Sequence, residues 1–314
     1  MALPLRQPVL PQLARSAKEL PVGDGWSYEP KWDGFRCIAF VDGDDVELQS
    51  RNGRSLTRYF PELRFPPGRL VLDGEIVVLD GRGEPDFDAL GQRIHPAKSR
   101  VDMLARETPA RFVAFDVLSA GDDVLLEVGQ QERRERLEAL VDASVDLTPR
   151  TLDPEEAQPW LRHAEGVIAK RTDAAYKPGE RTGMVKVKRV RTIDAVVIGW
   201  RPGKAEGTLG ALIVALHGPD GELRVVGHSS GFTAKEKREL PAKLAPYETG
   251  ERGSGDPSRW SAGRDLEWVA LRPELVVEIA FDHMSNGRIR HNAKVLRWRD
   301  DKPPEACTLD QLDD

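Results

Sequence analysis

The chain contains 314 residues, of which 39% are hydrophobic and 31% are charged, and its formal net charge is −6. These values are typical of a soluble globular protein with one large domain or two ordinary ones, and they exclude a disordered or fibrous chain.

No apolar run is long enough to span a membrane, and four prolines and several charges interrupt the N-terminal segment, unlike a secretory signal. Cys37 and Cys307 lack the spacing of a zinc site, so we expect a reduced, cytoplasmic location.

The first predicted elements are strands. Residues 35–50 form two alternating apolar runs joined at Asp42-Gly43, a pattern that predicts a hairpin. Residues 69–87 contain an apolar run that ends in a Gly-rich turn, and further short strands are expected at residues 110–118, 165–170 and 184–188. Two helices interrupt this series. Residues 130–143 place Leu137, Leu140 and Val141 on one helical face, and Asp153 is the expected N-cap of a helix that runs towards His163.

After about Arg191 the pattern changes to apolar strands separated by Gly, Pro and Asp, at residues 194–200, 209–216, 223–230 and 275–281. Thr233 and Glu236 form a capping box for one helix, in which Pro241 is a candidate interruption. Residues 250–263 are the most loop-like segment. Several strands and one helix in about 120 residues favour a small oligonucleotide-binding (OB) barrel, with a jelly roll or an irregular sandwich as alternatives. We therefore predict an α+β protein with an antiparallel-sheet domain over residues 1–190 and an OB-fold domain over residues 191–314.

Two stretches of the acidic chain are rich in basic residues. Between Lys170 and Lys204, ten Lys or Arg residues stand against three acidic ones, and the run from Arg288 to Lys302 adds Arg290, Lys294, Arg297 and Arg299. Such a stretch is often only the solvated face of a strand. Because attraction to phosphate is local and screened within about 10 Å at 0.1 M salt, the distribution of charge matters more than the total. Two dense stretches favour a polyanionic ligand.

The motif Lys31-Trp32-Asp33-Gly34 is the centre of the functional prediction. Alone it could be a turn at a strand edge, with Lys31 solvated. It is followed in order by short motifs that lie on or beside expected strands: Ser50-Arg51-Asn52-Gly53, Asp73-Gly74-Glu75, the strand with Phe115, Glu165-Gly166, and Lys186-Val187-Lys188. Each motif also has a structural interpretation, since Phe115 could belong to the core and Lys186 and Lys188 could form a polar strand face.

Taken together, EPKWDGFR, SRNG, LDGEIVV, FVAFDVL, EGVIAKR and MVKVKR resemble the covalent nucleotidyltransferases, a family of ATP-dependent DNA ligases, RNA ligases and mRNA capping enzymes. The segment Arg297-Trp298-Arg299-Asp300-Asp301-Lys302 resembles the RxDK motif that ends the ligase OB domain. The resemblance runs from Glu29 to Lys302 and is close to the small stand-alone bacterial (LigC-type) DNA ligases. It implies that residues 1–190 form a nucleotidyltransferase (adenylation) domain.

The resemblance implies a role for each motif residue. Lys31 would carry a covalent AMP, Phe115 would stack on adenine, and Glu29 would accept a hydrogen bond from the adenine amino group. The remaining positions would contact AMP or ATP, namely Arg36, Arg51, Glu75, Lys186 and Lys188. Glu165 and Glu75 would bind Mg²⁺, for which Mn²⁺ is a plausible substitute. Arg299 and Lys302 would orient the leaving pyrophosphate after the second domain closes over the first.

The chemistry explains the need for such neighbours. With a pKa near 10.4, only about one lysine in a thousand is the neutral nucleophile at pH 7.4, and lowering that pKa to neutrality costs about 4 kcal/mol. A divalent cation, Lys186, Lys188 and Arg51 would disfavour the ammonium form and would also neutralise charge in the transition state.

We therefore expect an ATP-dependent DNA ligase that seals nicked duplex DNA through lysyl-AMP and DNA-adenylate intermediates. The alternatives are an RNA ligase or capping-type transferase, and a catalytically silent DNA-binding module that keeps the fold. A monomer is the expected state, with no membrane association. A DNA-repair protein that delivers the substrate is a further expected partner, although the sequence does not identify it.

Overall fold

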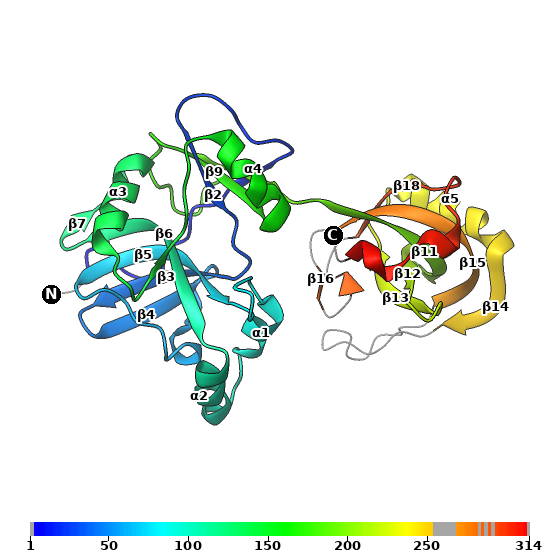
Figure 1. Ribbon diagram of the computed structural model, residues 1–314, viewed down its shortest axis with the longest axis horizontal. Helices are drawn as coiled ribbons and strands as arrows, with labels where there is room; N and C mark the ends of the chain where they lie inside the picture. Colours follow the sequence, from blue (N-terminus) through cyan, green and yellow to red (C-terminus); the bar gives the residue numbers. More distant parts are fainter. Residues whose placement is uncertain (1–2, 254–267, 282–283, 286–287, 290–292, 313–314) are drawn as a thin grey trace. The chain divides into compact units, whose positions relative to one another are not determined.

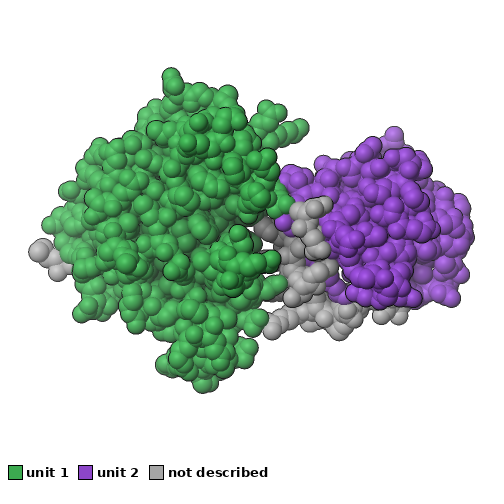
Figure 2. All heavy atoms as spheres, in the orientation of Figure 1, with its two compact units in different colours: residues 1–189 green, residues 190–314 purple. Residues whose placement is uncertain are grey.

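The computed structural model describes residues 3–253, 268–281, 284–285, 288–289 and 293–312. The chain divides into two compact units, residues 1–189 and residues 190–314, which we describe separately (Figures 1 and 2). Both contain antiparallel sheets with a few helices, so the predicted α+β class is confirmed.

Unit 1 contains two sheets. The larger sheet has the order β4-β3-β5-β6-β7, with β8 beside β6, and the smaller has the order β1-β10-β9-β2. The strands are β1 (Arg15–Ala17), β2 (Trp26–Pro30), β3 (Phe35–Asp42), β4 (Asp45–Ser50), β5 (Arg69–Val78), β6 (Ala110–Ala120), β7 (Asp123–Val124), β8 (Asp146–Leu147), β9 (Gly166–Arg171) and β10 (Met184–Lys188). The helices are α1 (Phe87–Gln92), α2 (Lys98–Glu107), α3 (Gln130–Leu140), α4 (Pro154–His163) and the 3-10 turn η1 (Thr57–Tyr59).

Local sequence signals account for most of these elements. The predicted hairpin is β3-β4, but its turn is Gly43-Asp44, because Asp42 already pairs with Asp45; Gly43 adopts the positive φ that this turn requires. Helix α4 begins as expected, with the Asp153 side chain accepting from the Glu155 amide. Alternate residues of β3, β5 and β6 are buried in one apolar cluster with Leu90 and Leu137. The polar residues of these strands are therefore left to face the other side.

Unit 2 is built on one curled sheet of order β13-β12-β11-β15-β14, with β18 paired to β15. Its strands are β11 (Arg191–Pro202), β12 (Leu209–His217), β13 (Leu223–Ser229), β14 (Glu248–Gly253), β15 (Trp268–Phe281), β16 (Met284–Ser285), β17 (Arg288–Ile289) and β18 (Lys294–Trp298). The helical segments are α5 (Ala234–Leu244), η2 (Ala245–Tyr247), η3 (Pro304–Ala306) and η4 (Leu309–Leu312). This arrangement fits the predicted OB-like domain.

Two local predictions for unit 2 need correction. Helix α5 has the expected capping box but continues through Pro241, because Leu240 and Leu244 on either side of it are buried in the core. The loop predicted over residues 250–263 is wrong for residues 250–253, which end β14, paired with β15. Residues 254–263 lie outside the described part, as do Arg290 and the other gaps in the range 282–292.

Candidate active site

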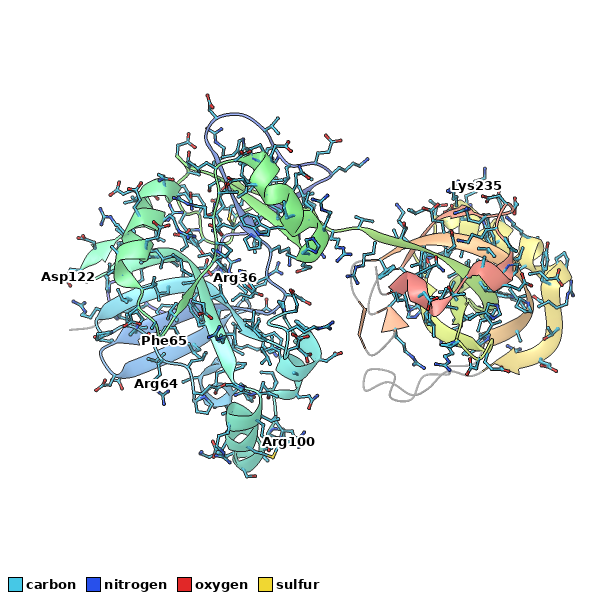
Figure 3. All side chains as sticks on the ribbon, in the orientation of Figure 1. Arg36, Arg64, Phe65, Arg100, Asp122 and Lys235 are labelled. Carbon is cyan, nitrogen blue, oxygen red and sulfur yellow. The ribbon has the colours of Figure 1, made fainter. Side chains whose placement is uncertain are left out.

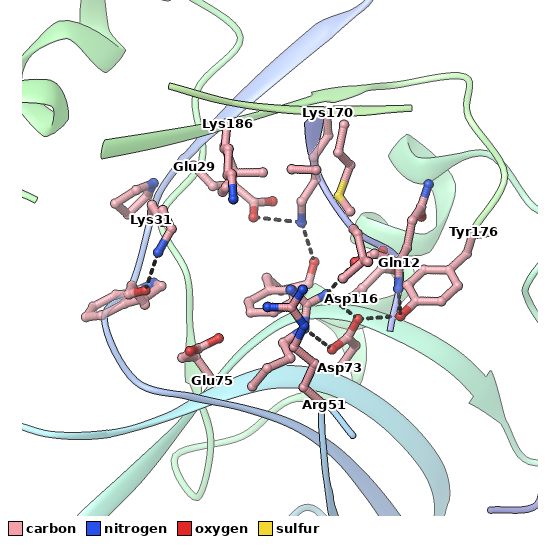
Figure 4. A pocket seen from close by; sticks show the side chains of 18 of the residues that line it. Gln12, Glu29, Lys31, Arg51, Asp73, Glu75, Asp116, Lys170, Tyr176 and Lys186 are labelled. Carbon is pink, nitrogen blue, oxygen red and sulfur yellow. Dashed lines mark hydrogen bonds and ion pairs between the residues drawn. The ribbon is translucent and has the colours of Figure 1, made fainter. Parts of the chain in front are cut away.

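A cavity in unit 1 collects side chains from both sheets (Figure 4). Its lining comes from the segment before β1, from β2, β3, β5, β6, β9 and β10, and from the loops that follow β2, β4 and β9. The residues are Gln12, Leu13, Ala14, Glu29, Pro30, Lys31, Trp32, Arg36, Arg51, Asp73, Glu75, Phe115, Asp116, Ile168, Lys170, Tyr176, Arg181, Met184 and Lys186. The labelled Arg36 lies within unit 1, whereas the exposed Arg64 and Arg100 lie at its surface (Figure 3).

Lys31 follows β2 and is fixed by its backbone, since its amide donates to the Gly166 carbonyl at 2.9 Å. Gly34 is required nearby, because a Cβ there would overlap the Ile76 carbonyl of β5. The Lys31 ammonium forms an ion pair with Glu165, whose other oxygen lies 3.3 Å from Lys188 Nζ. Glu165 thus bridges the two lysines. A lysine held as an ammonium in such a pair is not a nucleophile.

The guanidinium of Arg36 is anchored on the floor of the cavity. Asp73, which is fully buried, accepts two hydrogen bonds from Arg36 at 2.6 and 2.7 Å and one from the Tyr176 hydroxyl at 2.6 Å. The same hydroxyl accepts from the Gln12 amide at 2.9 Å. Burial alone would lower the pKa of Arg36, but the charge and hydrogen bonds of Asp73 outweigh it and raise that pKa. Arg36 is therefore a fixed positive charge.

Two cations lie beside the ring of Phe115. The Arg36 guanidinium lies 4.4 Å and Lys170 Nζ 4.9 Å from the ring centroid, both within cation–π range. Lys170 also donates to the Phe115 carbonyl at 3.1 Å and pairs with Glu29 at 2.7 Å. Glu29 is 2% exposed, and Arg134 of α3 lies 3.5 Å from its second oxygen. Glu29 and Phe115 are thus joined through Lys170.

Two cavity groups have shifted pKa values. Burial raises the pKa of Glu75 to about 7, with smaller upward contributions from Asp73 and Glu165 that Arg36 and Lys31 oppose. Burial, followed by the charges of Lys188 and Lys31, lowers the pKa of Lys186. Both pKa shifts favour the uncharged form of the group, which is the expected behaviour of charged side chains held in a partly desolvated site.

Comparison with known proteins identifies the family. Residues 8–188 match the family described as the ATP dependent DNA ligase domain, and residues 205–302 match the ATP dependent DNA ligase C terminal region. DNA ligase C1 of Mycolicibacterium smegmatis is 47% identical over 335 residues, which cover 100% of this chain and 96% of that protein. The chain belongs to the ATP-dependent DNA ligases.

Further relatives agree with this placement. DNA ligase C of Mycobacterium tuberculosis is 44% identical to this ligase over 347 residues, with 100% of this chain and 96% of the relative covered. Among solved structures, mycobacterial DNA ligase D complexed with ATP and MES has a TM-score of 0.54 and 32% identity, covering 96% of this chain and 98% of that chain. The matches favour the predicted DNA ligase over the RNA ligase and capping alternatives.

The structure brings most of the predicted site residues of the ligase together. Glu29, Lys31, Arg36, Arg51, Glu75, Phe115 and Lys186 line the cavity. Glu165 and Lys188 are not among the lining residues; Glu165 joins the group through its ion pair with Lys31, and Lys188 through its ion pair with Glu165. Arg299 and Lys302 belong to unit 2, where both contact the carboxylate of Asp194.

Sequence reasoning missed several residues of the cavity. Asp73 and Lys170 stand inside the quoted motifs LDGEIVV and EGVIAKR but were given no role; a charged side chain within an apolar strand was a usable signal. Gln12, Tyr176 and Arg181 belong to no quoted motif. They reach the cavity only because the segment before β1 and the loop after β9 lie side by side, with the Leu13 amide donating to the Glu180 carbonyl at 2.8 Å. That contact has no sequence signature.

The basic stretches are less uniform than the sequence suggested. The run from Lys170 to Lys204 is divided between the two units, and within it Lys170 and Lys177 pair with Glu29 and Glu127. In the second run, Arg297 pairs with Glu278. In the part of the ligase that the structure describes, no helix has the length and apolar character needed to cross a membrane.

Proposed function

We propose that this ligase seals nicked duplex DNA in three steps, with Lys31 as the nucleophile. In the first, Lys31 Nζ attacks the α-phosphorus of ATP; an N–P bond forms, the bond to pyrophosphate breaks, and the amine loses a proton. In the second, a DNA 5′-phosphate oxygen attacks the same phosphorus and the N–P bond breaks. In the third, the 3′-hydroxyl attacks the DNA phosphate, AMP leaves, and the phosphodiester is complete.

The observation that carries this proposal is the setting of Lys31. Its side chain is 22% exposed and lines a cavity together with the cations Arg36, Arg51 and Lys186. Several positive charges beside one lysine stabilise negative charge on a phosphate during transfer. Opening of the pair with Glu165 would release the amine. A polyphosphate bound near Arg51 and Lys186 would compete with Glu165 for the Lys31 side chain.

The nucleotide contacts follow from the cavity walls. We assign the adenine to the neighbourhood of Phe115 and Glu29, whose carboxylate can accept from an exocyclic amino group. Lys170 contacts both residues and would hold them in place. Arg36 would contact the ribose or a phosphate only with donors that Asp73 leaves available. Glu75, Lys186 and Lys188 complete the proposed AMP contacts.

The acidic residues are suited to Mg²⁺, with Mn²⁺ as a substitute. Within the described residues no group of three or more His, Cys, Asp or Glu side chains gathers for a metal. Mg²⁺ in nucleotide enzymes needs no such cage, because one or two carboxylates and the substrate phosphates suffice. Glu165 and Glu75 are of the right chemistry, and the cation would supply positive charge beside the reacting phosphate. Binding at Glu165 would also take that carboxylate away from Lys31.

In unit 2 we assign Arg299 and Lys302 to the pyrophosphate leaving group, which confines their role to the first step. Duplex DNA is the polyanion that the remaining exposed cations would contact. We also propose that the ligase is a monomer; size-exclusion chromatography with light scattering tests this, and a dimer mass contradicts it. A DNA-repair partner stays a prediction from the sequence.

Intact mass after incubation with ATP and Mg²⁺ tests the proposal directly. The wild type should gain the mass of one AMP. Lys31→Ala should gain none and should keep its circular dichroism spectrum and melting temperature. Lys31→Arg should fail equally, because a guanidinium stays protonated. An adduct on Lys31→Ala would assign the nucleophile elsewhere, and its absence from the wild type would favour the silent DNA-binding module.

A further inference from the structure

Asp194 contacts both cations assigned to pyrophosphate. Its carboxylate accepts from Arg299 Nη1 at 2.8 and 3.0 Å and lies 3.0 Å from Lys302 Nζ. Arg299 is held from its other side by Asp301, which accepts from Nε at 2.8 Å and from Nη2 at 2.9 Å. The side chain of Asp194 is 11% exposed, whereas that of Asp301 is 67% exposed. Of these two carboxylates, only that of Asp194 contacts both Arg299 and Lys302.

The position of Asp194 is unusual for a strand. It stands in β11 between Ile193 and Ala195, which are both buried in the apolar core of unit 2. Its register partner on β15 is another acid, Glu278. Like charges directly opposite on neighbouring strands repel, so this pair costs stability unless cations lie over it. A polar residue with no ligand-related task could be replaced here by an apolar one.

The backbone of Asp194 is fixed as firmly as its side chain. Gln311, in η4 near the end of the described chain, accepts from the Asp194 amide at 2.9 Å and donates to the Asp194 carbonyl at 3.1 Å. The Arg299 amide in turn donates to the Val276 carbonyl at 2.8 Å. The backbones of Asp194 and Arg299 are therefore both held by hydrogen bonds. The carboxylate of Asp194, which lies between Arg299 and Lys302, sets the distance between these two cations.

We infer that Asp194 is the positioning residue that aligns Arg299 and Lys302 for the leaving pyrophosphate of the first step. This rests on the role proposed above for those two cations. Asp194 touches no reacting atom; it preorganises two flexible side chains, so that less conformational freedom is lost when pyrophosphate or the β- and γ-phosphates of ATP bind. Because Asp194 lies six residues after Lys188, one short stretch of chain carries both the last predicted cation of unit 1 and the residue that organises unit 2.

The test uses Asp194→Asn, which keeps the shape of the side chain and removes its charge. Two reactions are compared: formation of the AMP adduct from ATP, and sealing of a nick whose 5′ end already carries AMP. A third assay runs the first step backwards: pyrophosphate attacks the lysyl-AMP phosphorus, the N–P bond breaks, ATP forms and Lys31 regains a proton. We expect Asp194→Asn to slow adduct formation and its reversal about tenfold, chiefly through a higher KM for pyrophosphate, and to change sealing less than about threefold.

Controls separate positioning from folding. Asp220→Asn removes an acid from the exposed Arg224 pair of unit 2 and should leave all three assays unchanged. In a Lys302→Ala background the effect of Asp194→Asn should be smaller than in the wild type but not absent, because one of the two cations that Asp194 aligns is gone and its contact with Arg299 remains. Equal losses in all assays, or an unchanged KM for pyrophosphate, would overturn the inference. If Lys302→Ala alone leaves adduct formation intact, the proposed role of the cations fails instead.

Discussion

The two clusters that we assign to phosphate handle their charges in opposite ways. At the unit 1 cavity, Lys31 and Lys188 share the one carboxylate of Glu165, and Asp73 is taken up by Arg36 and Tyr176. In unit 2, Arg299 and Lys302 face Asp194 and Asp301, so two cations are balanced by two acids. The first cluster carries an excess of positive charge that a nucleotide relieves. The second is complete without a ligand.

This difference matches what each cluster is proposed to do. Unit 1 must hold AMP through two transfers, so a strong and lasting attraction is useful there. Unit 2 would contact pyrophosphate only while it leaves, and a pair already balanced by carboxylates can release it again. Binding energy that is equal in the ground and transition states would not speed the first step. Arg299 and Lys302, aligned in advance but already balanced by carboxylates, would not add such uniform binding energy.

The largest expected effect concerns Glu165, the acid shared by Lys31 and Lys188. We expect Glu165→Gln to slow AMP adduct formation about 100-fold or more, the scale seen when one preorganised electrostatic group is removed. Adduct formation should be followed by intact mass at several Mg²⁺ concentrations. Glu127→Gln is the matched control, since Glu127 pairs with Lys177 at 2.9 Å on the surface of the same unit. Faster adduct formation in Glu165→Gln would mean that Glu165 only restrains Lys31.

The next effect separates the two clusters by reaction step. We expect Lys302→Ala to slow adduct formation about tenfold to thirtyfold, because it removes one cation that faces the leaving group. Sealing of a nick that already carries 5′-AMP needs no pyrophosphate site and should change much less. Rates of both steps under single-turnover conditions decide the matter. Equal losses in the two steps would point to DNA binding or misfolding.

A smaller effect concerns stability and the half-buried Glu75. Its pKa of about 7 in the folded ligase lies above the ordinary 4.5, so the folded state binds the proton more tightly. The resulting stabilisation is complete below about pH 4.5 and is lost as the pH rises through about 7, amounting to at most about 3 kcal/mol. Urea unfolding of the wild type should show this decline between pH 5 and pH 8, whereas Glu75→Gln should lack it. Parallel curves for the two proteins would contradict the assignment.

Much of this arrangement was predictable from the sequence, for an identifiable reason. The hairpin β3-β4, the cap at Asp153 and the capping box at Thr233 are local, so neighbouring residues determine them. Lys31 and Glu75 could be named because the motifs that contain them resemble those of the covalent nucleotidyltransferases, and the structure places both at the cavity.

The remaining features depend on contacts between distant segments. Tyr176 reaches Asp73 across 103 residues of sequence, and Gln12 reaches Tyr176 across 164. Asp194 meets Arg299 only because β11 and β18 both lie beside β15. Local sequence propensities do not predict such long-range contacts. The same applies to Pro241, whose effect on α5 was decided by burial of its neighbours rather than by its own preference.

The smallest expected effect concerns DNA, which we expect to contact cations outside the two clusters. Lys204 is exposed in the turn between β11 and β12, and Arg201 is half-buried at the end of β11. If both face phosphate, the double variant Arg201→Ala/Lys204→Ala should still form the AMP adduct. Its affinity for nicked duplex should depend less on salt, because the slope of log K against log salt changes by about 0.9 for each phosphate that the protein neutralises.

The measurement is affinity for nicked duplex at several salt concentrations. The slope of log K against log salt should become less steep by about one to two in the double variant. Lys235→Ala/Arg238→Ala is the matched control, because it removes two exposed cations from α5 of the same unit. A smaller change in the control would place the contact at the β11-β12 turn, while equal flattening in both variants would indicate only a general response to net charge. A wild-type slope near zero would remove the electrostatic basis for DNA binding by this acidic chain, and would leave the charge imbalance of the unit 1 cavity as a feature of nucleotide binding alone.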